Sequence, residues 1–355
     1  MGRLFSKQLH LSSNKLLGKK LNPNPVEKCY ICKNLFENLG HFLKLMLHTS
    51  SEYSFKTFSV GAIIKPSIVD RDDYIRSQYK LKGVDSIKTD ITKELGKLYS
   101  RKTKREKDHV DPDVTFTVNI KEELCQLRSK SITISGRYVK SKRGYPQKQQ
   151  SCDNCSGKGC RICDFHGIAE FDSIEGAISK IIFKGFGGTT AKFTWIGGED
   201  KSSLVLGSGR PFFVKIQNPL KRKTRLSDTL VDSIKIHNLK LVSESPKRSL
   251  KFNSTIRIKI STESAMDSKS LIKLKNLTND PVTVYEKSGK QAGKRIFEIR
   301  YKKNSKNTFT LIMRAEGGLP IKRFVVGDDI APNISDILGT SCICEEFDFL
   351  DVKVQ

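Results

Sequence analysis

Two adjacent acids, Glu199 and Asp200, stand between glycine-rich turns in TWIGGEDKSSLVLGSGRPFFV, residues 194–214. A carboxylate that stays ionised near Lys or Arg in a phosphate-binding cleft can act as a nucleophile or as a base. Taken alone, a GED turn is more often a solvated loop. The GSGRPF that follows indicates a tight pocket wall with exposed backbone, and this context favours a chemical role for the acids.

Cysteines form the second group of residues that could do chemistry. The segment SCDNCSGKGCRICDFHG has the spacing Cys-x2-Cys-x4-Cys-x2-Cys and comprises Cys152, Cys155, Cys160 and Cys163. Two such hairpins can offer four thiolates to one tetrahedral Zn²⁺, and Gly157 and Gly159 allow the turn between them. His166 could replace one thiolate, and four incidental thiols are the weaker alternative. Because four sulfurs fill the coordination sphere, we predict a structural rather than a catalytic zinc.

The charge balance limits the class of partner. Lys and Arg number 64 against 38 Asp and Glu, a formal net charge of +26 that is spread along the chain. Such an excess favours a polyanionic partner, and nucleic acid is the leading one. Because no apolar run approaches about 18 residues and no segment is typical of a basic amphipathic anchor, we expect a soluble protein with no membrane partner.

The cysteine content bears on the compartment. The N-terminal MGRLFSKQLHL lacks the apolar core of a secretory signal. We therefore expect a cytoplasmic protein whose nine cysteines stay reduced, which favours metal binding over disulfides.

The pattern of elements indicates three segments that must position these residues. Residues 1–150 combine a helical pattern in NLFENLGHFLKLMLHT, an exposed charged helix and loop in LGKLYSRKTKREKDHVDPD, and two strand-like runs, VTFTVNI and SITISGRYVKS, that would close this unit. Residues 151–166 are the cysteine-rich segment. Residues 167–355 open with a predicted helix in FDSIEGAISKIIFKGFGG, capped by Asp172 and stopped by Gly185.

Strands dominate the remainder of the chain. We expect them in AKFTWIG, RPFFVKIQ, SIKIHNLKLVS, TIRIKIST, PVTVYEK, RIFEIRYKK, TFTLIMRAE and EEFDFLDVKV, with helices in MDSKSLIKLKNL and PIKRFVV. This order predicts an α+β domain with a mostly antiparallel sheet and helices on one face. The basic runs KSKRGYPQKQQ and PLKRKTR are typical of phosphate-contacting loops, with solvated faces as the alternative of equal weight.

Three quoted segments together resemble one known family. RYVKSKRGYPQKQQSCDNCSGKGCRICDFHG, GGEDKSSLVLGSGRPFFVKIQNPLKRK and GGLPIKRFVVGDDIAPNISDILG are similar, in this order, to the archaeal-type tRNA pseudouridine(54/55) synthases. The resemblance implies a THUMP-related RNA-binding domain followed by a pseudouridine synthase catalytic domain with a mixed, mostly antiparallel sheet. It also implies isomerisation of uridines 54 and 55 in the T arm, with tRNA as partner, no protein partner and no cofactor for catalysis.

The resemblance assigns the residues of the site. The Asp of the family's Gly-Arg-Glu-Asp loop falls on Asp200, which would attack the uracil base or the ribose C1′. Lys322, in GGLPIK, takes the position of the basic residue that pairs with this nucleophile. Phe297, where the family usually has Tyr, would stack on the extracted base. Tyr301, on the same face of the same predicted strand, is the alternative, and an ordinary core position is the competing interpretation of Phe297.

Two departures from the family shape the hypotheses. Gly198 stands where the family has Arg, and we expect Lys201 or Arg210 to hold the flipped nucleotide in its place. The family tends to carry a Cys-x-x-Cys just before Gly-Arg-Leu-Phe, so we expect Cys29 and Cys32 to find two further ligands upstream of the MGRLF with which this sequence begins.

Two other functions compete with this one. The loss of Arg at position 198 makes a non-catalytic RNA-binding protein that retains the synthase fold the main alternative. A zinc-dependent nuclease or deaminase is disfavoured, because no His or Glu accompanies the cysteines in a deaminase pattern.

Overall fold

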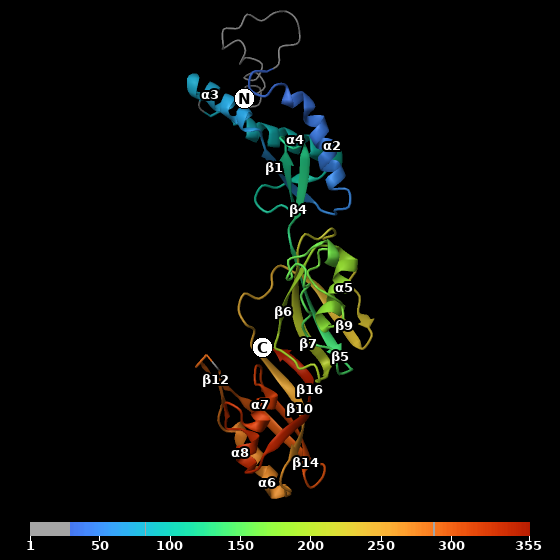
Figure 1. Cartoon of the computed structure of the whole chain (residues 1–355), viewed down its shortest axis with the longest axis vertical. Helices are drawn as coiled ribbons and strands as arrows, with labels where there is room; N and C mark the ends of the chain where they lie inside the picture. Colours follow the sequence, from blue (N-terminus) through green and yellow to red (C-terminus); the bar gives the residue numbers. More distant parts are fainter. Residues whose placement is uncertain (1–28, 82, 287) are drawn as a thin grey trace, which may run out of the picture. The chain divides into compact units, whose positions relative to one another are not determined.

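The computed structural model describes residues 29–81, 83–286 and 288–355, which divide into two compact units (Figure 1). The first unit ends at Lys130 and includes the segment 218–223, and the second comprises 131–217 and 224–355. The division therefore falls after Lys130 rather than at the predicted residue 150, because the run SITISGRYVKS joins the sheet of the second unit. Alternating β-branched residues indicate a strand but not the sheet that it joins.

The first unit is a small mixed sheet with helices. Its strand order is β2-β1-β3-β4, with β1 parallel to both neighbours and β4 antiparallel to β3. Its elements are η1 (Leu35–Asn38), α2 (Leu39–Thr49), β1 (Thr57–Ile63), α3 (Pro66–Gln78), α4 (Ile87–Thr103), β2 (Glu106–Lys107), β3 (Val114–Asn119) and β4 (Leu124–Ser129).

Helix α4 begins the charged stretch that we expected to be exposed, and it is amphipathic instead. Ile87, Ile91, Leu95 and Tyr99 recur every four residues and are all buried in the core of this unit. Asp90 in the first turn is also buried, whereas Arg101 and Lys102 in the last turn are exposed, so the prediction holds for one face only. Ser86 caps the helix by accepting a hydrogen bond from the backbone of Thr89.

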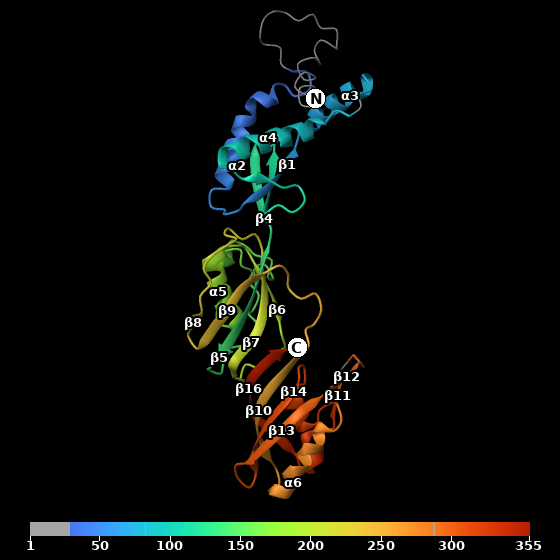
Figure 2. The same cartoon turned by 180° about the vertical axis from the view of Figure 1, so that it is seen from behind.

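The second unit is built on a nine-stranded sheet of order β13-β14-β10-β16-β7-β5-β9-β8, with β6 also paired to β7 (Figure 2). Every pair is antiparallel except β16 with β7. The sheet strands are β5 (Ile132–Lys140), β6 (Ala191–Trp195), β7 (Val205–Ile216), β8 (Thr229–Val231), β9 (Ile234–Val242), β10 (Phe252–Thr262), β13 (Ile296–Lys303), β14 (Thr308–Glu316) and β16 (Cys342–Val354). The predicted mixed, mostly antiparallel sheet is confirmed.

The other elements of this unit are one helix of 13 residues, α5, and several shorter helices and strands. They are η2 (Arg161–Cys163), α5 (Ile174–Phe186), α6 (Ser268–Ile272), η3 (Lys273–Thr278), β11 (Val282–Tyr285), β12 (Gln291–Lys294), α7 (Ile321–Val326), β15 (Ile330–Ala331) and α8 (Ile334–Leu338). Strands β12, β11 and β15 form a separate small sheet.

Helix α5 is capped by Ser173, whose hydroxyl accepts from Gly176, and runs to Phe186, so the predicted cap at Asp172 and stop at Gly185 are wrong. Asp172 instead accepts from the side chain of Gln149.

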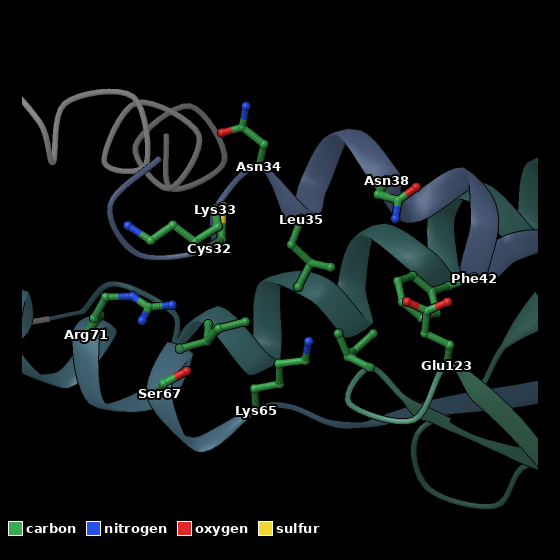
Figure 3. A pocket seen from close by; sticks show the side chains of 12 residues that line it. Cys32, Lys33, Asn34, Leu35, Asn38, Phe42, Lys65, Ser67, Arg71 and Glu123 are labelled. Atoms are coloured by element: carbon green, nitrogen blue, oxygen red, sulfur yellow. The ribbon is translucent and has the colours of Figure 1, made fainter. Parts of the chain in front are cut away.

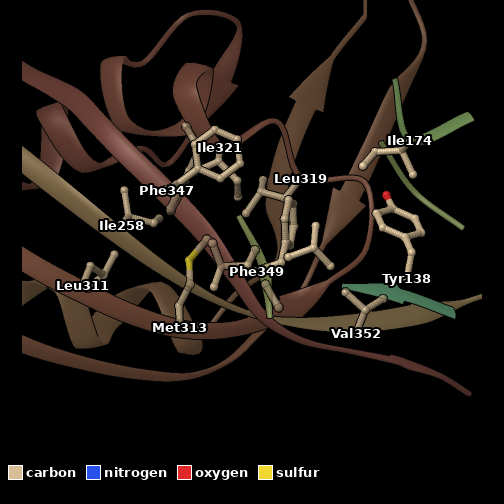
Figure 4. Packing of buried hydrophobic residues seen from close by; sticks show 14 of the residues in the cluster. Tyr138, Ile174, Ile258, Leu311, Met313, Leu319, Ile321, Phe347, Phe349 and Val352 are labelled. Atoms are coloured by element: carbon tan, nitrogen blue, oxygen red, sulfur yellow. The ribbon is translucent and has the colours of Figure 1, made fainter. Parts of the chain in front are cut away.

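The core of the second unit fixes the segments that carry the candidate site. Figure 4 shows Phe347 and Phe349 of β16 among the buried side chains of the neighbouring strands and Ile321 of α7. Because α7 packs on β16 and β16 pairs with β7, the loop before β7 and the start of α7 are anchored to adjacent strands. Among the described residues, no helix combines the length and the apolar character needed to cross a bilayer.

Candidate active site

Asp200 lies in the loop between β6 and β7, and Lys322 lies in the first turn of α7. The Nζ atom of Lys322 donates to Oδ2 of Asp200 at 2.8 Å, although the two residues are 122 positions apart. The Asp200 side chain is 33% exposed, so solvent or a substrate can reach the carboxylate. The predicted pair is thus brought together, with its acid open on one side.

The electrostatics keep Asp200 ionised. Partial burial raises the pKa of its carboxyl, but the hydrogen bond from Lys322 and those from the backbone and hydroxyl of Ser202 outweigh burial. The net result lowers the pKa of Asp200 from 3.8 to about 2. At neutral pH this group is therefore a carboxylate with an exposed face, which is the form that a nucleophile needs.

Glu199, the neighbouring acid, lies in the interior. Its side chain is fully buried between Lys140, whose Nζ is 3.1 Å from Oε1, and Arg210, whose Nε is 3.6 Å from Oε2. Both cations are themselves fully buried. Arg210 also donates to the carbonyl of Ile196 at 2.9 Å and lies 4.2 Å over the ring of Phe349. These buried contacts fix the inner side of the loop that carries Glu199 and Asp200.

The basic run KSKRGYPQKQQ, for which phosphate contact and a solvated face were equally weighted, contacts the loop that carries Asp200. Lys140 donates to the carbonyl of Asp200 at 3.1 Å, and the backbone of Gly144 donates to that of Lys201 at 2.9 Å. Gln147 donates to the carbonyl of Gly197 at 3.2 Å. Sequence reasoning missed this supporting role because it depends on a contact between segments about sixty residues apart.

Arg143 extends the support to β16. Its guanidinium binds both oxygens of the buried Asp348, at 2.6 and 3.1 Å, and also donates to the carbonyl of Ser202. Asp348 accepts two more hydrogen bonds, from Arg257 at 2.9 Å and from the backbone of Leu204 at 3.0 Å. Although burial raises the pKa of Asp348, these donors lower it below its ordinary value. The loop that carries Asp200 is therefore tied to the sheet at both ends.

Phe252 is a further positioning residue that the sequence did not indicate. A Cβ atom at Gly197 would lie 2.5 Å from its ring, and one at Gly317 would lie 2.2 Å from it. The Gly317 backbone also donates to the Phe252 carbonyl at 2.7 Å. Gly197 precedes Asp200 and Gly317 precedes Lys322, so one aromatic ring packs against both segments that carry the pair.

The remaining predicted residues lie in different surroundings. Arg210 is fully buried and engaged as described, so its predicted direct contact with a nucleotide does not fit this position. Lys201 is exposed beside Asp200. Gly198 is exposed, and a Cβ atom there would meet only Gln147 Oε1, at 4.0 Å, so the position has room for the family's Arg.

The two candidate aromatic residues lie on opposite sides of β13. Phe297 sits at a bulge with the guanidinium of Arg314 4.9 Å over its ring. Tyr301 pairs with Leu311 and packs against the core on the side of the helices. The hydrogen bonds and ion pairs of Asp200 do not include either residue, so the stacking aromatic stays a prediction.

The cysteine cluster has the geometry expected of a structural metal centre. The sulfurs of Cys152, Cys155, Cys160 and Cys163 all lie within 4.8 Å of one another, the one such group among the described residues. Two pairs are 3.8 Å apart, close to the edge of about 3.8 Å that a tetrahedron with Zn–S bonds of about 2.3 Å requires.

Donors to the sulfurs further fit a thiolate set. Backbone N–H groups of Gly159, Cys160 and Gly167 donate to Cys155 or Cys163 at 3.2 Å. The Asn154 amide donates to Cys160, and this hydrogen bond, together with smaller contributions from the backbone of Cys163 and Ile162, lowers the pKa of that thiol to about 6. His166 points elsewhere: it stacks on Phe183 at 3.8 Å and hydrogen-bonds the carbonyl of Thr189, so it anchors the knuckle. The four thiols therefore suit zinc without His166.

The other Cys-x-x-Cys belongs to the first unit. The pKa of the Cys32 thiol is raised, first by its hydrogen bond with Cys29 and then by burial. Cys32 also lines a hollow of about 410 Å³ with the cations Lys33, Lys65 and Arg71 (Figure 3). The two further ligands that we expect would precede the MGRLF segment, which itself lies outside the described residues.

The second basic run, PLKRKTR, is partly structural as well. Arg222 pairs with Asp113 at 2.8 Å and donates to the carbonyl of Lys130 at 2.7 Å within the first unit. Lys221 and Lys223 are exposed and free to face solvent. Arg225, the last residue of the run, is exposed as well, so the phosphate-contacting role proposed for this run rests on these three cations.

Comparisons with known proteins agree with this architecture. A family model described as "Pus10, C-terminal" matches residues 133–353, and one described as "Pus10 THUMP domain, archaeal" matches residues 42–119. The chain is similar to proteins named tRNA pseudouridine synthase Pus10 from Nitrosopumilus maritimus (65% identity; 100% of this chain and 94% of that protein) and Cenarchaeum symbiosum (33%; 100% and 89%). A third, from Methanosphaera stadtmanae, is 30% identical over 93% of this chain and 90% of its own. The chain belongs to the Pus10 family.

Proposed function

We propose that this chain is a tRNA pseudouridine synthase that converts uridines 54 and 55 of the T arm into pseudouridine, with Asp200 as the nucleophile. The single observation that carries the proposal is the ion pair between Lys322 and the one-third exposed Asp200. Relatives that are named tRNA pseudouridine synthase Pus10 and span nearly the whole chain support the reaction class. The choice of positions follows the resemblance in the motifs.

The chemistry is an isomerisation, so substrate and product contain the same atoms. A carboxylate oxygen of Asp200 adds to the base or to ribose C1′, and the glycosidic C1′–N1 bond breaks. The uracil turns and its C5 forms a bond to C1′. In the ribose route this bond displaces the carboxylate from C1′, and in the base route the carboxylate leaves the base after the bond has formed. C5 then loses its proton and N1 gains one. Lys322 holds the attacking group ionised, and the buried network of Glu199 keeps it in place.

Other residues have supporting roles in this proposal. Phe297 or Tyr301 would stack on the extracted base, and the exposed Lys201 would contact a phosphate next to it. Zinc held by the four cysteines would stabilise the knuckle through its bonds, and the reaction would not use it. The expected setting is the cytoplasm, where tRNA is the partner and no protein partner is required.

The test uses an unmodified tRNA transcript, with pseudouridine mapped by carbodiimide treatment and primer extension. Wild-type protein should give stops at positions 54 and 55, and the Asp200→Asn variant should give neither while still binding the transcript. Transcripts with cytidine at either position should lose only the corresponding stop. If wild-type protein binds tRNA without forming product, the non-catalytic RNA-binding alternative is correct.

A further inference from the structure

A hollow next to the catalytic loop has no role in the chemistry described so far. It has a volume of about 300 Å³ and lies between the end of β6 and the segment that leads into β10. Its lining includes Trp195, Gly197, Lys247, Arg248 and Phe252. This size is at the lower end of the range for small-molecule sites.

The walls suit a nucleobase. Trp195 is part-exposed and stacks on Phe193, with ring centroids 4.9 Å apart and the planes 12° from parallel, so one face of the indole is covered. Trp195 also lines the hollow, so a base bound there would lie beside this residue. Phe252, another lining residue, packs closely against Gly197 and Gly317, which restricts the movement of its ring.

The rim suits a phosphate. Lys247 and Arg248 are exposed at the edge of the hollow. Lys247 pairs with Glu244 at 3.2 Å, but both side chains are highly exposed, and such a pair is worth little and is easily exchanged for a phosphate. The hollow thus combines an aromatic wall and a cationic rim, the two features that single-stranded nucleic-acid sites share.

The position of the hollow indicates which nucleotide it would bind. Gly197, which lines the hollow, is three residues before Asp200, so the two are at most about 10 Å apart along the chain. A nucleotide that neighbours the target uridine can bridge such a distance. We propose that this hollow binds the nucleotide next to the target uridine, with its base on Trp195 and its phosphate at Lys247 and Arg248, an inference that rests on the proposed function.

The experiment exploits the fact that Trp195 is the one tryptophan in the chain. Tryptophan emission of the full-length protein is followed while unmodified tRNA transcript is added, with the Trp195→Phe variant as background. Stacking should quench the emission. An abasic site placed next to the target, on one side, should restore most of the emission although gel-shift binding persists. An abasic site in the anticodon loop is the matched control and should leave the quenching unchanged.

A charge-matched pair of variants tests the rim. Lys247→Ala with Arg248→Ala should raise the tRNA concentration needed for half-maximal quenching by about tenfold. Lys273→Ala with Lys275→Ala removes the same charge from exposed positions of η3 and should change it less than about twofold. Equal shifts for the two pairs would contradict a phosphate at this rim.

Mapping pseudouridine in the same samples separates the two proposals. Saturating binding with unchanged emission, or quenching that survives abasic sites on both sides of the target, would overturn the hollow as a nucleotide site even if product forms. Quenching that depends on a neighbouring base, with no pseudouridine, would overturn the proposed reaction and leave the nucleotide site standing.

Discussion

Glu199 and Asp200 are adjacent in the chain, yet their side chains lie in opposite surroundings. Glu199 is fully buried and contacts two buried cations, whereas Asp200 is one-third exposed and pairs with a lysine that is itself 53% exposed. Removal of Glu199, the inner acid, would leave the buried charges of Lys140 and Arg210 without a counter-charge. Removal of Asp200, the outer acid, would leave a lysine that water can solvate. Glu199 therefore holds the loop in place, whereas the carboxylate of Asp200 is accessible to a substrate.

The largest effect on stability is expected at the inner acid. Glu199→Gln leaves Lys140 and Arg210 buried without a counter-charge, so the free energy of unfolding should fall by about 3 kcal/mol or more. Chemical denaturation measures this. Glu298→Gln breaks an exposed pair with Arg300 and should cost under about 0.5 kcal/mol. Similar losses in the two variants would contradict the buried, loop-holding role of Glu199.

The aromatic ring that contacts both segments comes next. Gly317→Ala places a methyl group 2.2 Å from the Phe252 ring, so it should cost about 1–3 kcal/mol of stability and lower kcat. Adding Phe252→Leu should restore part of both, because the smaller side chain makes room. Gly293→Ala, whose Cβ would be 3.6 Å from Pro281, is the matched control. If the double variant shows the sum of the single losses, the ring does not position the pair.

The Lys322→Ala variant tests the pairing of Asp200 with Lys322 through the pH dependence of kcat/KM. The folded-state pKa of Asp200 is lowered to about 2, so its contribution to stability is present above pH 3.8 and is lost as the pH falls through 2. Without Lys322 the pKa rises, because partial burial is less well offset. Between pH 8 and 5, kcat/KM should then fall severalfold more than in wild type or in Lys201→Ala. Superimposable profiles for the three proteins would argue against this pairing.

The smallest effect on kcat/KM is expected at Gly198, in the loop that carries Asp200. Gly198→Arg introduces the family's residue at a position with room for it and should raise kcat/KM roughly two- to tenfold through a contact with phosphate. Gly40→Arg adds the same charge in the first unit, where a Cβ atom would meet nothing within 4 Å, and should not raise kcat/KM. Equal rate increases would mean that the gain comes from general charge.

Local spacing and motif resemblance predicted part of this site. The four cysteines lie within eleven positions of one another, so their spacing alone sufficed to predict the cluster. The pairing of Asp200 with Lys322 spans 122 positions and depended on the resemblance. The helix in PIKRFVV and the strands around the loop followed from periodicity, which is a local property.

The supporting residues could not be predicted, because tertiary contacts assign their roles. Lys140 and Arg143 belong to a basic run that is typical of RNA-binding loops, yet they bind carbonyl and carboxylate groups of this chain. Arg210 follows the loop closely in sequence, but the alternation of β7 turns it into the core. The division between units was missed for the same reason, since β5 gives no local sign of the sheet that it joins.

The central claim is that Asp200 reacts with the substrate while its neighbour only holds the loop. The most direct measurement is the single-turnover rate of pseudouridine formation in the T arm, with enzyme in excess over tRNA, for wild type and Asp200→Asn. We predict a rate lower by roughly 10³-fold or more in the variant, with tRNA affinity and unfolding free energy unchanged. Product formation within about tenfold of wild type would contradict the claim.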